Sequence, residues 1–239
     1  MTPTLKMMAI TLLSLGTSPF LCSIASPENG TPSVTESHIE ENTALEASSP
    51  DQAAALGLEV LTQLRSGNSD HEAYAQFLGF RSVKEVQQIV LGDPLRAYGV
   101  QLDKLKAFKG GPNLNLEDPL FFDARTVVYP LYTKTNDLKD LRSSLTVVSE
   151  DGNTWYRART GSAKFITQVQ KYRTSPSNFL VVVPALGRRF LADRFNGQLM
   201  LIPLIGEHDF IEGKLMPAHA IFKKLAVEAN KVFPKRQRK

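Results

Sequence analysis

Three residues of one predicted strand carry side chains well suited to holding a ligand. Trp155, Arg157 and Arg159 alternate along residues 153–160, a run in which aromatic and β-branched residues favour an extended strand. Alternate residues of a strand point to the same face, so the pattern predicts an indole ring beside two guanidinium groups. Such a pairing suits an anionic or sugar-bearing ligand. The candidate ligand-binding residues are these three and a second basic pair: Trp155, Arg157, Arg159, Arg188 and Arg189.

Basic residues dominate the chain beyond its beginning. From residue 52 onward there are 27 Lys and Arg against 18 Asp and Glu. Between Arg157 and Arg194, eight basic residues accompany a single acid, Asp193. This excess favours an anionic partner. The alternative is a solvated basic face that only keeps the protein soluble.

Residues typical of catalysis and metal binding form no familiar pattern. The chain has neither a Gly-x-Ser-x-Gly nor a Ser-x-x-Lys motif, and its one cysteine is Cys22. Glu207, His208 and Asp209 mix acid and imidazole, but neighbouring strand residues point to opposite faces, and adding His219 gives no known metal spacing. We therefore expect no catalytic residue, no metal and no cofactor. A hydrolase that uses His208 or His219 in a dispersed site remains an alternative.

The first 25 residues have the layout of a secretory signal peptide. A short basic segment, 1–6, precedes a mostly apolar run, 7–22, and small residues stand at Ser23 and Ala25. A buried helix or an uncleaved anchor is the alternative, but the apolar run is shorter than the ~20 residues that a spanning helix needs. Cleavage after Ala25 would leave no membrane-spanning segment. We expect a periplasmic or extracellular protein.

Two polar segments flank the predicted folded region. Residues 26–50 hold five Glu and neither Lys nor Arg, which is typical of a disordered acidic linker. This linker is either a passive spacer or a tail that folds back on the basic domain. Residues 235–239 form a basic tail, either a solvated end or an electrostatic tether to anionic lipid head groups.

Residues 51–92 are expected to form three short helices, either as a separate subdomain or as a cap on a sheet. Apolar residues recur there at helical spacing, and Ser82 with Glu85 has the spacing of a capping box. Residues 93–234 are expected to form the sheet domain. Its segment 95–108 is expected to be extended.

Turn residues and helical periodicity outline the sheet domain. Asp151-Gly152 and Asn196-Gly197 predict two tight hairpin turns. The apolar run 179–186 suits a central strand that is covered on both faces. Apolar residues at a period near 3.6 predict helices over 162–172 and 217–232.

These elements predict an α+β fold: an antiparallel sheet of about six or seven strands covered by two helices, with a short helical N-terminal region. The favoured function is an exported, non-catalytic binding or assembly protein of the cell envelope. Its expected partner is an envelope protein, or an anionic glycan or lipid bound through the basic aromatic sheet face. No nucleic acid is expected, because no ribonucleoprotein or zinc-finger motif occurs.

Overall fold

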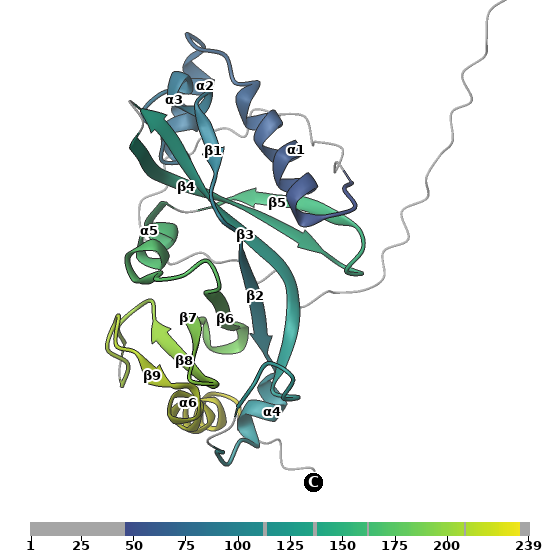
Figure 1. The fold of residues 1–239 in the computed structure, drawn as a ribbon, viewed down its shortest axis with the longest axis vertical. Helices are drawn as coiled ribbons and strands as arrows, with labels where there is room; N and C mark the ends of the chain where they lie inside the picture. The colour runs from purple at the N-terminus through teal and green to yellow at the C-terminus, as the bar shows by residue number, and fades with distance from the viewer. Residues whose placement is uncertain (1–45, 112–113, 136–137, 162, 208, 235–239) are drawn as a thin grey trace, which may run out of the picture. The chain divides into compact units, whose positions relative to one another are not determined.

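The computed structural model describes residues 46–111, 114–135, 138–161, 163–207 and 209–234, all within one compact unit, His38–Lys239. The predicted signal peptide, most of the acidic linker, His38, His208 and the basic tail lie outside these described residues. The helices of the described part are α1 Pro50–Thr62, α2 Ser69–Phe77, α3 Val83–Val86, α4 Leu102–Lys106, α5 Ala163–Tyr172, the 3₁₀ turn η1 Pro184–Leu186 and α6 Ala218–Val232. The strands are β1 Ile89–Leu91, β2 Leu95–Val100, β3 Phe121–Thr135, β4 Leu138–Ser149, β5 Trp155–Thr160, β6 Phe179–Val183, β7 Arg188–Phe195, β8 Gln198–Pro203 and β9 Met216–Pro217 (Figure 1).

All nine strands belong to one sheet, with the order β5-β4-β3-β2-β6-β7-β8-β9. The short strand β1 continues along the edge of β3 beyond β2, so β1 and β2 share one neighbour. Every pair is antiparallel except β2 and β6, which run parallel. The α+β class is therefore confirmed. The sheet has more strands than the predicted six or seven, and its pairing is antiparallel as expected except for one parallel pair. The parallel pair arises because β6 joins the sheet beside β2 rather than beside β5, the strand that precedes it.

Helices cover both faces of the sheet. On one face, α5 packs over apolar residues such as Val128 and Leu191. On the other face there are two cores. Helices α1, α2 and α3 cover β3, β4 and β5 around Leu145, whereas α6 covers β6, β7 and β8 around Phe222. The two predicted helices thus exist as α5 and α6, and the 51–92 region packs on the sheet as a cap (Figure 1).

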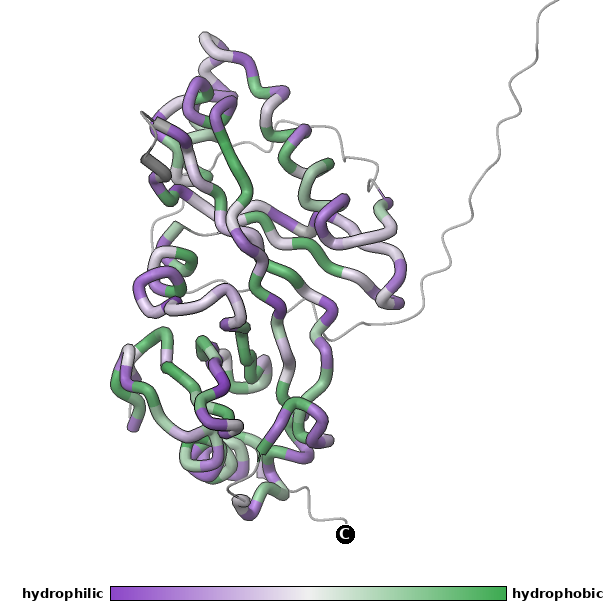
Figure 2. Tube along the Cα trace, in the orientation of Figure 1, coloured by the Kyte–Doolittle hydropathy of each residue, from purple (hydrophilic) through white to green (hydrophobic). Residues whose placement is uncertain are grey.

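The alternation of hydropathy explains these layers. Along β6, Val181 and Val183 face the α6 core while Leu180 faces the α5 core, so the strand is apolar on both sides. Figure 2 shows the corresponding hydrophobic colour along β6. This is the central strand that the run of apolar residues predicts.

The segment 95–108 is only partly extended. It begins as β2, but Gln101 ends the strand and α4 follows. Leu102 and Leu105 are three residues apart and lie on the same side of the helix, with Leu105 fully buried in the α6 core. The prediction of a single extended segment is wrong because this spacing was not recognised as helical. The short helix α4 brings Lys106 beside α6.

Candidate ligand-binding surfaces

A β-bulge separates Arg159 from the other two residues of the predicted strand face. Opposite β4, Arg157 pairs with Val147 and Arg159 pairs with the adjacent Thr146, so one residue of β5 has no counterpart. An extra residue in one strand reverses the alternation of the side chains beyond it. Trp155 and Arg157 therefore share the α1 face, whereas Arg159 lies on the opposite, α5 face. The predicted grouping of Trp155, Arg157 and Arg159 on one face needs this correction.

Helix α1 covers the face that holds Trp155 and Arg157. Trp155 is buried, with 6% of its surface exposed, and belongs to the core under α1. Its backbone also forms a two-hydrogen-bond bridge with Ala47. The side chain of Arg157 packs so closely on Gly57 that a Cβ atom there would lie 2.8 Å from its Cδ. The indole thus packs inside the protein, where no ligand reaches its ring.

Arg188 and Arg189 are neighbours on β7 and point to opposite faces of the sheet. The Arg188 side chain is 14% exposed and pairs with Glu228 of α6 at 2.8 Å. It also contacts the Glu207 carboxylate. With its charge balanced by two acids, Arg188 ties β7 to α6 and to the loop after β8.

Arg189 lies on the α5 face of the sheet, as Arg159 does. Its guanidinium carbon is 5.0 Å from the centre of the Phe165 ring, in the first turn of α5. Burial lowers the pKa of Arg189, and the positive charge of Arg159 lowers it further.

The histidines of the described chain do not assemble a reactive centre. His71 accepts a hydrogen bond from the backbone N–H of Arg65 through Nδ1 at 2.8 Å. His219 lies in the first turn of α6, and its Nδ1 is buried without a hydrogen-bond partner. Across the described residues there is no group of three His, Cys, Asp or Glu side chains placed to hold a metal ion.

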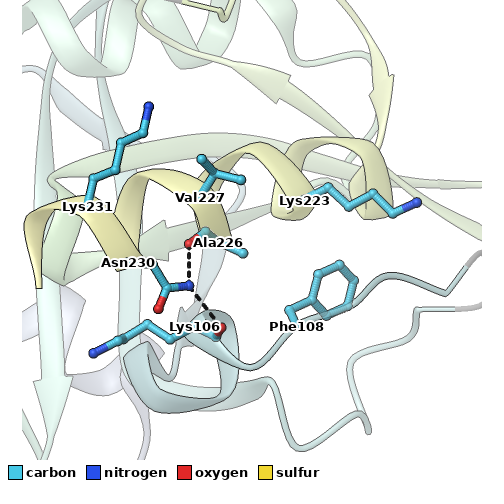
Figure 3. Close-up of a pocket in the computed structure, with 7 residues that line it drawn as sticks. All are labelled: Lys106, Phe108, Lys223, Ala226, Val227, Asn230 and Lys231. Carbon is cyan, nitrogen blue, oxygen red and sulfur yellow. Dashed lines mark hydrogen bonds between the residues drawn. The ribbon is translucent and has the colours of Figure 1, made fainter. Parts of the chain in front are cut away.

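A shallow basic groove of about 570 Å³ lies between α4 and α6. Its lining consists of Lys106, Phe108, Lys223, Ala226, Val227, Asn230 and Lys231 (Figure 3). Asn230 joins its two walls by donating from Nδ2 to the carbonyl of Lys106 at 3.0 Å and to that of Ala226 at 2.8 Å. Phe108 packs edge-on against buried Phe222, with ring centres 6.1 Å apart. The groove therefore lies along a contact between α4 and α6 that the Asn230 hydrogen bonds and the Phe108–Phe222 packing stabilise.

The charge of the groove is entirely positive. Three lysines line it, and no acid does. Figure 3 shows their amino groups spread around the groove, with Val227 on the same outer side of α6. Val227 is 56% exposed. It is four residues from both Lys223 and Lys231, so the three side chains share one face of α6. The groove thus combines the exposed apolar side chain of Val227 with three lysines.

Sequence reasoning did not find this groove. Lys106 and Lys223 are more than a hundred residues apart, and only the packing of α4 on α6 makes them neighbours. A local signal does exist within α6, where Lys223, Val227 and Lys231 follow each other every four residues. That stripe indicates an exposed basic–apolar face, opposite the buried stripe around Phe222.

No family model, no curated protein and no solved structure matches the chain. Among the described residues, no helix combines the length and the apolar character needed to cross a membrane.

Proposed function

We propose that the protein is a non-catalytic, envelope-associated binding protein that docks its α4–α6 groove onto an anionic lipid surface. The observation that carries this proposal is the exposed Val227 between Lys223 and Lys231, in a groove without acidic residues. Lysines and apolar side chains make different contacts at a membrane surface. Lysines contact phosphate groups, and an apolar side chain enters the boundary between head groups and acyl chains.

The shape of the groove favours an extended partner over a small molecule. A small-molecule site is usually a deep concavity in which polar groups converge on the ligand. Here the groove is open, and the lysine amino groups diverge around it (Figure 3). Diverging cations can each meet a different phosphate group on a surface. Phe233, which follows α6 directly, is 36% exposed and adds apolar surface at its end.

Two sequence features support this placement. The proposed signal peptide would deliver the protein to a compartment bounded by lipid. The chain continues beyond α6 with four basic residues, Lys235, Arg236, Arg238 and Lys239. A polybasic segment next to a basic helix increases attraction to anionic lipids by about 1 kcal/mol per charge near the surface.

Vesicle co-sedimentation tests the proposal. The protein beginning at Ser26 is mixed with vesicles of phosphatidylcholine alone or with added phosphatidylglycerol, so that the apolar run 7–22 cannot contribute. We expect binding only when phosphatidylglycerol is present, with a loss of affinity as salt rises. In the double variant Lys223→Gln/Lys231→Gln, affinity should fall by about 30-fold, because each lysine contributes about 1 kcal/mol.

The control variant is Lys84→Gln/Lys214→Gln. Both lysines are exposed, one on α3 and one in the loop before β9, and neither lines the groove. The control removes the same total charge, but from positions outside the groove. Because these lysines do not contact the lipid surface in the proposed orientation, the control should bind as the parent protein does. Equal losses in the two double variants would show only a general charge effect and would reject the groove as the docking surface.

A further inference from the structure

One edge of the sheet ends at β5. In the strand order, β5 has β4 on one side and no further strand of the described chain on the other. Within the described part of the chain, Ala47 is the residue that pairs with this outer edge. Its N–H donates to the carbonyl of Trp155 at 3.0 Å, and the N–H of Trp155 donates to the carbonyl of Ala47 at 2.8 Å. These two hydrogen bonds are the first step of an antiparallel pairing.

The backbone of β5 can continue this pairing. Successive residues of a strand direct their N–H and C=O groups to alternate sides, so Arg157 directs its groups to the same outer edge as Trp155. The bulge in β5 comes only after Arg157. Because the bridge is antiparallel, its register places Leu45 opposite Arg157. An unpaired edge of this kind is a template for a further strand.

The residues that precede Ala47 have the pattern of a half-buried strand. Ala47 is 5% exposed and lies with Trp155 in the core under α1, whereas Glu46 is exposed. Leu45 is two residues before Ala47, so in an extended chain it shares the inner face with Ala47. Apolar residues therefore alternate with a charged one as the position requires.

Charge also favours this segment as the occupant of the edge. Residues 26–46 contain five Glu and neither Lys nor Arg, whereas β5 contains two Arg and no acid. An antiparallel course carries Glu40 and Glu41 toward Arg159, which is exposed. Since the segment belongs to the same chain, its effective concentration at the edge is high.

We infer that residues 41–45 pair with the outer edge of β5 as an antiparallel strand that continues the bridge between Ala47 and Trp155. This strand closes the edge to other chains. The carboxylates that precede it offset the positive charge of Arg159. The edge of β5 belongs to the core under α1 and is separate from the groove between α4 and α6.

Engineered disulfides test this pairing on the full chain, in which Cys22→Ser removes the native thiol. Leu45→Cys/Arg157→Cys places two thiols opposite each other, where Cα atoms about 5.5 Å apart allow a disulfide. The matched control is Ala44→Cys/Arg157→Cys, which puts the first thiol on the other face of the strand. Under mild oxidation, mass spectrometry should show intramolecular disulfide formation at least about tenfold faster in the first pair.

Amide hydrogen exchange is a second readout that leaves β5 unchanged. Leu45→Pro removes the N–H that donates to the carbonyl of Arg157 in this register. The backbone amide of Arg157 should then exchange at least about tenfold faster than in the parent protein. In Ala44→Pro the missing N–H faces away from β5, so the exchange rate at Arg157 should stay unchanged.

Three results would overturn the inference. Equal cross-linking of the two cysteine pairs would show that the segment has no fixed register on β5. Equal exchange rates at Arg157 in the two proline variants would show that no strand is hydrogen-bonded there. A disulfide between two molecules, in place of the intramolecular one, would show that a second copy of the chain supplies the strand.

Discussion

Asp151 organises the loop between β4 and β5 through its carboxylate. Oδ1 accepts hydrogen bonds from the backbone N–H groups of Asn153 at 2.8 Å and Thr154 at 2.7 Å. The same oxygen lies 3.2 Å from the Ser149 hydroxyl. Hydrogen bonds to the charged form, first from Thr154 and then from Asn153, lower the pKa of Asp151 to about 2. The expected two-residue turn is instead a five-residue loop, which is held by the Asp151 carboxylate and by the Ser149 hydroxyl, an acceptor for the backbone N–H of Gly152 at 2.7 Å.

This geometry predicts how stability depends on pH. Because the pKa of Asp151 is lower in the folded state than its ordinary value of 3.8, its contribution is complete above that value. It is lost as the pH falls toward about 2. In urea denaturation, the parent protein should therefore be more stable than Asp151→Asn near neutral pH, and the difference should shrink between these two pH values. A difference that stays constant down to the folded-state pKa would contradict the assignment.

At the scale of elements, a partly buried ion pair connects α3 to β4. Arg142 Nη2 lies 2.8 Å from Glu85 Oε1, and the two side chains are 15% and 12% exposed. Arg142 Nε donates to the same oxygen at 2.8 Å. This two-point contact adds to the burial of Val83 and Val86, which also hold the short helix on the sheet. By contrast, the pair Lys171–Glu212, at 3.4 Å, joins side chains that are 61% and 37% exposed.

Double-mutant cycles should separate these two pairs. With Glu85→Gln and Arg142→Gln, we expect a coupling free energy of unfolding of about 1–3 kcal/mol, since the pair is shielded from water. With Lys171→Gln and Glu212→Gln, the coupling should remain below about 1 kcal/mol, as for other exposed pairs. Urea denaturation of the parent protein, the four single variants and the two double variants gives both values. Equal couplings would contradict the structural role of the α3–β4 pair.

Elements that a short stretch of sequence specifies could be predicted. Features that depend on contacts between distant segments could not. Asn196 and Gly197 both adopt positive φ, 50° and 75°, and form the two-residue turn that their sequence predicts. The bulge in β5 has no such signature, because it exists only in the register between β5 and β4. For that reason the strand's position was predictable, but the face on which Arg159 lies was not.

At the scale of the whole sheet, the same limit applies to strand order and to the groove. The parallel contact of β2 with β6 joins segments about eighty residues apart, and no local pattern specifies it. Because β6 pairs with β2, the later helix α6 covers the same core that contains Leu105 of α4. The basic groove follows from that packing. The binding site that we propose therefore lies on a helix pair, whereas the sequence had directed attention to a sheet face.

The most direct test of the proposed docking surface is an environment-sensitive fluorophore placed on α6. In the protein beginning at Ser26, which has no native cysteine, Val227→Cys carries the probe and Phe77→Cys is the control. Phe77 lies on α2 and is 84% exposed, so both sites accept a label. Vesicles containing phosphatidylglycerol should shift the emission of the probe at position 227 toward that of an apolar environment and leave position 77 unchanged. A shift at position 77 alone, or at neither position, would contradict membrane docking through α6.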